Sequence, residues 1–346
     1  MNTSEMAAPT PQPDSEHIPA NAGQHEANSA PQSWMLTAVD AKYHWYDLVA
    51  GFPDKPDLHD PVGRYMRRMQ VDLEAAAHNH HLLFAITRAP VRFDVKGAIQ
   101  WGFFSLKLTL PLLVGADKAK DSITIELKVP MAATLKKPSV ALSENFLTLN
   151  WGGLVEALSI HDVLNTYGYG HNQPAGRVLY VGQTFDEDLR LSRGRLPALQ
   201  KLHSHLSGES DLLLLVLKMH VDVSCADGDP ADLPQNSHPE AAEALHTERM
   251  DVAQAALIRY FEGEQSRWHG VEERKLRGER LTAVQAHNHL VQFTIDLALP
   301  VPGSYDSLGS DEVAPAARHL LSCFIADGKA MVATMPIPQQ PYGNKG

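Results

Sequence analysis

The sequence has little cysteine and no long apolar run. Its two cysteines, Cys225 and Cys323, are too few for the disulfide framework that stabilises small secreted domains. The strongest apolar run, Leu212 to Leu217, is far shorter than the ~20 residues that a membrane-spanning helix requires. The first residues contain no basic stretch followed by an apolar one, which is the pattern of a secretory signal. We therefore expect a cytoplasmic protein with no membrane partner.

Several common catalytic and metal-binding motifs are also missing. The chain has neither the Gly-Lys-Ser/Thr of a P-loop nor the Gly-x-Ser-x-Gly of a nucleophile elbow, and no Cys-x-x-Cys or His-Glu-x-x-His pattern. Histidine is abundant, with 18 residues, and it clusters in residues 78–81 and 286–289, each time before an apolar stretch. We interpret both clusters as turns that precede strands, and a zinc or copper site is the alternative.

The charge balance is acidic, with 30 Lys and Arg against 41 Asp and Glu and a net charge of −11. This balance disfavours loose, charge-driven binding of nucleic acid, because such affinity comes from neutralising phosphates. A small basic site on an acidic body is still compatible with it. The 44% of hydrophobic residues is enough for a packed core, which excludes a wholly disordered chain.

Length and composition predict about two domains after an N-terminal tail, at ~150 residues per domain. Residues 1–33 are rich in Pro, Ala, Asn, Ser and Gln and have almost no large apolar side chain, so we expect a disordered tail. Residues 34–150 are expected to form one domain, and residues 151–346 another. The predicted fold class is α+β.

Residues 34–150 are predicted to be mainly antiparallel β with one helix. Asp60 and Pro61 have the character of an N-cap and a first-turn proline, and apolar residues follow at helical spacing as far as Ala76. Apolar and polar residues alternate in 104–110 and in 123–129, which is typical of strands with one buried face. The role of this β domain is open, and docking of a protein partner is one hypothesis for it.

Residues 151–346 are predicted to form a small mixed α/β domain with a C-terminal strand extension. The run 211–223 is apolar on both faces at its start, which indicates a central strand. The predicted strands are residues 178–182, 211–223 and 291–299, and the predicted helices are residues 188–206 and 240–261.

One local pattern in this second domain carries a candidate chemistry. It begins with Tyr180-Val181-Gly182-Gln183-Thr184, and Arg190 lies eight residues after the glycine. Tyr169 lies eleven residues before Tyr180, and a later helix reads Leu257-Ile258-x-x-Phe261. Over roughly residues 160–262 this pattern resembles the GIY-YIG nuclease superfamily, in which a strand ends in Tyr-Ile/Val-Gly and a helix with an arginine follows.

The resemblance implies metal-dependent cleavage of phosphodiester bonds. Tyr169, Tyr180 and Arg190 then fall at catalytic positions, where a tyrosine assists proton transfer and the planar arginine clamps the phosphate. Arg193, Arg195 and Gln183 are the candidate nucleic-acid-binding residues, with DNA or RNA as the partner. A solvated helix face is the alternative for the arginines.

The family's later helix carries a metal-binding glutamate, and this chain has Gln254 at that position. The resemblance implies Mg²⁺ or Mn²⁺ there, but a neutral amide does not supply the charge that recruits the metal. Gln254 shares a helix face with Met250, Leu257 and Phe261, so it is expected to point toward the sheet.

Two interpretations follow from this substitution. In the first, which we prefer, the site is catalytically dead and the domain binds nucleic acid with weak or no phosphodiesterase activity. In the second, a nearby acid such as Asp251 replaces the glutamate and the protein is an active endonuclease. A third hypothesis, from a different class, is a non-catalytic module for protein assembly.

Overall fold

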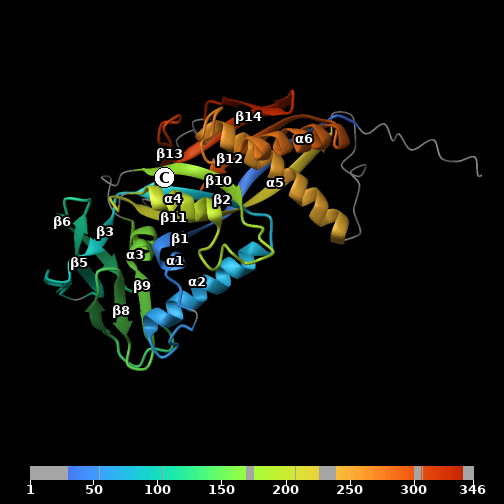
Figure 1. Cartoon of the computed structure of the whole chain (residues 1–346). Helices are drawn as coiled ribbons and strands as arrows, with labels where there is room; N and C mark the ends of the chain where they lie inside the picture. The colour runs from blue at the N-terminus through green and yellow to red at the C-terminus, as the bar shows by residue number, and fades with distance from the viewer. Residues whose placement is uncertain are drawn as a thin grey trace, which may run out of the picture.

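A computed structural model gives the fold and describes residues 30–53, 55–103, 105–168, 175–206, 208–225, 239–299, 305 and 307–337. The predicted α+β class is confirmed, because a large eight-stranded sheet with helices on both faces is joined to two small sheets at one end (Figure 1). Within the described residues, no helix is both long and apolar enough to cross a membrane.

The large sheet has the strand order β13-β10-β2-β11-β1-β12-β14-β15. All its pairings are antiparallel except β1 with β12 and β10 with β13, which are parallel. Its strands are β1 (Gln32–Trp45), β2 (Leu82–Arg88), β10 (Gly176–Gln183), β11 (Asp211–Cys225), β12 (Leu290–Ala298), β13 (Leu308–Gly309), β14 (Arg318–Ala326) and β15 (Lys329–Thr334).

Strand β2 shows why the centre of this sheet is covered on both sides. All seven of its residues are buried. Leu82, Phe84 and Ile86 pack into one apolar core, and the alternate residues Leu83 and Ala85 pack into another. Successive side chains of a strand point to opposite faces, so a strand that is apolar throughout requires a layer on each face.

Helices supply these two layers. On one face lie α5 (Pro239–Phe261) and α6 (Val271–His287), whose apolar residues share a core with Phe84. On the other face lie α1 (Tyr46–Ala50), α2 (Pro61–Ala77) and α4 (Pro197–His205). The predicted start of α2 is confirmed, because the Asp60 carboxylate accepts a hydrogen bond from the Gly63 backbone N at 3.2 Å.

The chain between β2 and β10 leaves the large sheet and builds the small-sheet unit around a third core. One sheet contains β3 (Val91–Phe93), β4 (Gln100–Trp101), β5 (Lys107–Val114) and β6 (Ala119–Glu126). The other contains β7 (Ser139–Leu142), β8 (Phe146–Asn150) and β9 (Val155–Ser159), and α3 (Ile160–Tyr167) follows.

A buried polar cluster joins the small-sheet unit to the large sheet. The Asp211 carboxylate, at the start of β11, accepts two 2.7 Å hydrogen bonds from Arg92 and lies 3.0 Å from Nε2 of His161. Nδ1 of His161 contacts the hydroxyl of Tyr305. Burial alone would raise the pKa of Asp211, but the hydrogen bonds from His161 and Arg92 hold it at about 2.

The strand pairing divides the chain differently from the boundary expected at residue 150. The large sheet takes β1 and β2 from the expected first domain and its other strands from the second. Residues 1–29 of the expected tail lie outside the described residues, whereas Gln32 already pairs with Cys225 in the sheet. The physical reason is that hydrophobic alternation marks a buried face but does not identify the partner strand.

Two helices also differ from expectation. The helix expected over residues 188–206 is shortened to α4, because Gly194 adopts a φ of 64° and Pro197 starts the helix three residues later. Helix α6 was not predicted, and only Leu281 and Val284 of its residues are buried. The strands predicted at 178–182, 211–223 and 291–299 are confirmed as β10, β11 and β12, and the helix expected over 240–261 is confirmed as α5. The strands expected at 104–110 and 123–129 correspond to β5 and β6, whose ends are shifted.

Candidate functional site

The candidate site begins at the C-terminal half of β10, where the register with β2 shifts between Val178 and Tyr180. The Tyr180 ring folds back over Gly182. A Cβ added at Gly182 would lie 2.7 Å from both Cε1 and the hydroxyl oxygen of Tyr180, closer than real Cβ contacts come. Glycine is therefore needed two residues after the tyrosine for the ring to adopt this position.

The Tyr180 ring is partly buried. It stacks on the His269 ring with the centroids 5.0 Å apart and the planes 19° from parallel. Burial, together with the carboxylates of Glu273 and Glu262, raises the pKa of Tyr180 far above 10. At neutral pH the phenol therefore keeps its proton.

His269 is held over Tyr180 by carboxylates from two elements. Its Nε2 lies 3.3 Å from Oε1 of Glu262, the residue after α5, and its Nδ1 lies 2.5 Å from Oε1 of Glu273 on α6. Burial alone would lower the pKa of His269, but the hydrogen bonds to Glu262 and Glu273 raise it above its ordinary value. Glu262 also accepts a hydrogen bond from the Val181 backbone N at 2.7 Å, which ties this cluster to β10.

Gln254 takes part in a neighbouring amide network. Nε2 of Gln183 donates to Oε1 of Gln254 at 3.0 Å and to Oδ1 of Asp251 at 2.8 Å. Oε1 of Gln183 lies 3.0 Å from Nδ1 of His80. The expectation that Gln254 points toward the sheet agrees with these contacts. Its oxygen is occupied as a hydrogen-bond acceptor.

A small cavity of about 80 Å³ is lined by residues of both clusters. Gln254, Asp251, Glu273 and Arg277 are among its lining residues, and the Arg277 charge also acts on Tyr180. The oxygen ligands that this cavity could offer a metal ion are therefore the Gln254 amide and the carboxylates of Asp251 and Glu273, and all three already have partners. Within the described residues, no group of three or more His, Cys, Asp or Glu side chains is placed to hold a metal ion.

The structure does not bring together all the described residues that the resemblance places at the site, which are the catalytic candidates Tyr180 and Arg190 and the metal position Gln254. Tyr180 and Gln254 share the neighbour Arg277, as described above. Arg190 lies in the turns after β10, where its Nε donates to Oδ1 of Asp186 at 3.2 Å and lies 3.7 Å from Oδ2 of Asp188, so within the described residues it pairs with these carboxylates and not with Tyr180 or Gln254. Tyr169 lies outside the described residues.

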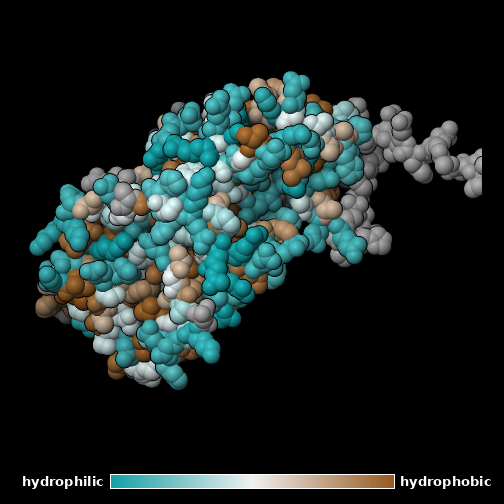
Figure 2. All heavy atoms as spheres, in the orientation of Figure 1, coloured by the Kyte–Doolittle hydropathy of each residue, from teal (hydrophilic) through white to brown (hydrophobic). Residues whose placement is uncertain are grey.

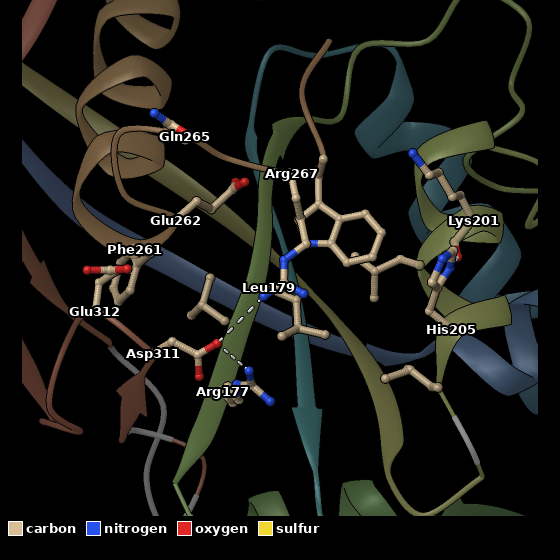
Figure 3. A pocket seen from close by; sticks show the side chains of 14 residues that line it. Arg177, Leu179, Lys201, His205, Phe261, Glu262, Gln265, Arg267, Asp311 and Glu312 are labelled. Atoms are coloured by element: carbon tan, nitrogen blue, oxygen red, sulfur yellow. Dashed lines mark hydrogen bonds and ion pairs between the residues drawn. The ribbon is translucent and has the colours of Figure 1, made fainter.

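The other nucleic-acid candidates remain on the surface. Arg193 and Arg195 are exposed in the segment between β10 and α4. Next to this segment a cavity of about 570 Å³ lies along β10 (Figure 3). Arg177 and Arg267 face Asp311 on one side of it, and Lys201 and His205 of α4 lie on the other.

An aromatic residue that the sequence reasoning did not select lies between these groups. Nζ of Lys201 is 5.9 Å from the centre of the Trp268 ring, and the His205 ring meets Trp268 edge-on with the centroids 5.7 Å apart. His269, Glu273 and Arg277 were missed as well. The only sequence signal for them was the Glu273–Arg277 spacing of four residues, which is an ordinary helix pair.

No family model matches this chain, and no curated protein and no solved structure matches it either.

Proposed function

We propose that this protein binds single-stranded DNA or RNA without cleaving it, through a GIY-YIG-like segment that has lost its chemistry. The observation that carries the proposal is a contrast in exposure. The tyrosine that the resemblance makes catalytic is partly buried and stacks on His269, whereas Arg193 and Arg195, which follow it in sequence, are exposed.

Two features support the loss of cleavage. A tyrosine with a strongly raised pKa keeps its proton at neutral pH and is therefore not available as a general base, and His269 covers one face of its ring. At the metal position, Gln254 offers a neutral oxygen that Gln183 already occupies. Mg²⁺ and Mn²⁺ prefer anionic oxygen ligands, so this site is weak for both metals.

The binding surface is the segment 189–206 together with Trp268. This segment has four Lys and Arg residues and no acidic residue, on a chain with a net charge of −11. Arg193, Arg195 and Lys201 are exposed, and Lys201 lies over Trp268. Cations beside an aromatic ring suit an unpaired strand, because the phosphates meet charge and a base stacks on the ring.

Fluorescence anisotropy with a labelled single-stranded oligonucleotide tests this proposal. We expect binding that weakens as salt rises, and no cut product with Mg²⁺ or Mn²⁺. Arg193→Ala with Arg195→Ala is expected to reduce the affinity by about tenfold. The matched control is Lys120→Ala with Lys128→Ala, two exposed cations of the small-sheet unit. Equal affinity of both double variants contradicts the proposed surface, and metal-dependent cutting contradicts the loss of chemistry.

A second candidate function is protein assembly through the small-sheet unit. Phe103 is 91% exposed and Met131 is fully exposed. Figure 2 shows hydrophobic residues gathered over this part of the molecule. Exposed apolar side chains of this size are typical of surfaces that meet another protein. Light scattering of the wild type and of Phe103→Ser with Met131→Ser tests whether this surface drives association.

We also propose a cytoplasmic location. Both cysteines are free in the structure, Cys323 being buried in the core between the large sheet and α5. Free thiols suit a reducing compartment. Fractionation of cells that express the tagged chain tests this assignment.

A further inference from the structure

A second large cavity lies between α5, α6 and the turn that joins β14 to β15, with a volume of about 650 Å³. This volume is within the range of small-molecule sites. Its walls are fixed by close packing. Gly328 has a φ of 66°, and a Cβ there would lie 2.9 Å from the Gly278 carbonyl of α6. The hairpin turn therefore rests directly on the helix backbone.

The floor of this cavity is aliphatic. Ala255 and Ile258 of α5, Leu281 of α6 and Ala330 of β15 line it, and all four are buried in the core. Met331 is more exposed and lines the cavity too. Among the described residues that line it there is no aromatic ring, so a nucleic-acid base has no stacking partner here.

The rim is cationic. Five of the lining residues are Lys or Arg and two are acidic. Arg259 is paired with Glu264 at 3.6 Å, and Arg277 with Glu273 at 2.9 Å. The remaining cations are Arg274, Lys275 and Lys329, against the single carboxylate of Asp327. Arg274 donates to the backbone oxygens of Ser266 and His269, and these oxygens do not neutralise its charge.

We propose that this cavity binds a free fatty acid of medium chain length. The aliphatic floor buries the hydrocarbon chain, and the rim cations bind the carboxylate. A ligand with only one of these two parts would leave either apolar surface or charge unmatched. This site is separate from the nucleic-acid surface, since Arg193, Arg195 and Trp268 do not line it.

Isothermal titration calorimetry with decanoate, below its micelle concentration, tests the proposal on the full chain. We expect one decanoate per chain and an affinity at least about tenfold above that for decanol, which lacks the charge. Lys275→Glu with Lys329→Glu is expected to weaken decanoate binding by about tenfold or more. Lys120→Glu with Lys128→Glu, the same charge change on the small-sheet unit, is expected to leave it unchanged.

A second variant tests the apolar half of the site. Met331→Trp places a larger side chain at the cavity wall, and we expect it to abolish decanoate binding while circular dichroism shows a folded chain. Wild-type protein is also expected to unfold at a higher temperature with decanoate, because the ligand binds only the folded state. Four results would overturn the proposal. Decanoate could be displaced by an oligonucleotide, or the chain could bind only phosphatidylglycerol vesicles. Decanol could bind as tightly as decanoate, or the Lys275→Glu, Lys329→Glu variant could bind decanoate as tightly as the wild type.

Discussion

Nε2 of Gln183, at the end of β10, donates to Oε1 of Gln254 on α5 across 3.0 Å. This bond connects two segments that the motif resemblance had linked only by spacing along the chain. It also defines the state of position 254, whose oxygen acts as a neutral acceptor. A carboxylate at the same place would lie beside Asp251, to which Gln183 also donates.

The first prediction concerns this position. Gln254→Glu is expected to raise the affinity for Mn²⁺ by about tenfold, because two neighbouring carboxylates replace a carboxylate and an amide. Calorimetric titration with MnCl₂ measures it. Gln200→Glu, on the exposed face of α4, is the matched control. Unchanged metal binding in Gln254→Glu would count against the resemblance to GIY-YIG nucleases, since that resemblance places the metal ligand at this position.

Local signals explain how much of this architecture could be read from the sequence. Asp60 and Pro61 marked the start of α2 because capping and the fixed proline φ act within one turn. The apolar stretch from Asp211 marked a central strand for an equally local reason. Strand neighbours could not be inferred, because Gln32 pairs with Cys225 and Leu290 across most of the chain.

The residues of the candidate site also fall into those that local sequence signals indicated and those that depend on tertiary packing. Tyr180 and Gln254 were selected from motif spacing, and both belong to one connected polar region. His269 could not be predicted because its role is to stack on the Tyr180 ring, and this contact depends on how α6 packs. Helix α6 itself was missed because its charges are spread around the helix and only Leu281 and Val284 are buried.

A second prediction concerns His269. His269→Ala removes the imidazole that pairs with Glu262, whose side chain is only 3% exposed and keeps its hydrogen bonds from the Val181 backbone N and the Ser266 hydroxyl. We expect the free energy of unfolding to fall by about 3 kcal/mol, because a buried carboxylate is left without its cation. Urea denaturation measures it. The control is His220→Ala at an exposed pair with Asp222, where we expect a change below about 0.5 kcal/mol.

The same variant has a pH signature. The pKa of His269 is raised in the folded protein, so its contribution to stability is complete below its unfolded pKa of ~6.5 and is lost as pH rises through its folded pKa. The difference in unfolding free energy between wild type and His269→Ala is therefore expected to shrink above neutral pH. A difference that grows with pH would contradict the assignment of a charged imidazole.

A third prediction concerns His44, whose effect on stability has the opposite pH dependence to that of His269. This histidine is buried in β1, and burial, with a smaller effect of Lys42, lowers its pKa from 6.5 to about 4. The unfolded chain therefore binds a proton between pH 6.5 and 4 that the folded chain does not. We therefore expect the free energy of unfolding to fall by about 3 kcal/mol as pH is lowered from 6.5 to 4. In His44→Asn this share of the pH dependence should disappear from urea denaturation curves.

A fourth prediction concerns the buried cluster that joins the small-sheet unit to the large sheet. Asp211→Ala leaves Arg92 and His161 without their shared carboxylate, and we expect a loss of about 3–5 kcal/mol. Because the folded pKa of Asp211 is about 2, its contribution is present above pH ~3.9 and is lost as pH falls toward 2. Asp311→Ala, at an exposed pair with Arg177, serves as the control. Equal losses in the two variants would show that burial of the Asp211 cluster does not matter.

The last prediction returns to the tyrosine and the glycine of the motif. Gly182→Ala places a methyl group 2.7 Å from the Tyr180 ring, so the ring must leave its stack on His269. We expect a loss of about 1–3 kcal/mol in urea denaturation, the usual cost of overpacking. In a Tyr180→Ala background the methyl group meets no ring, and the same substitution should cost much less. The double-mutant cycle therefore isolates the contact between these two positions. If Gly182→Ala costs the same in both backgrounds, the glycine serves the backbone of β10 and not the position of the ring.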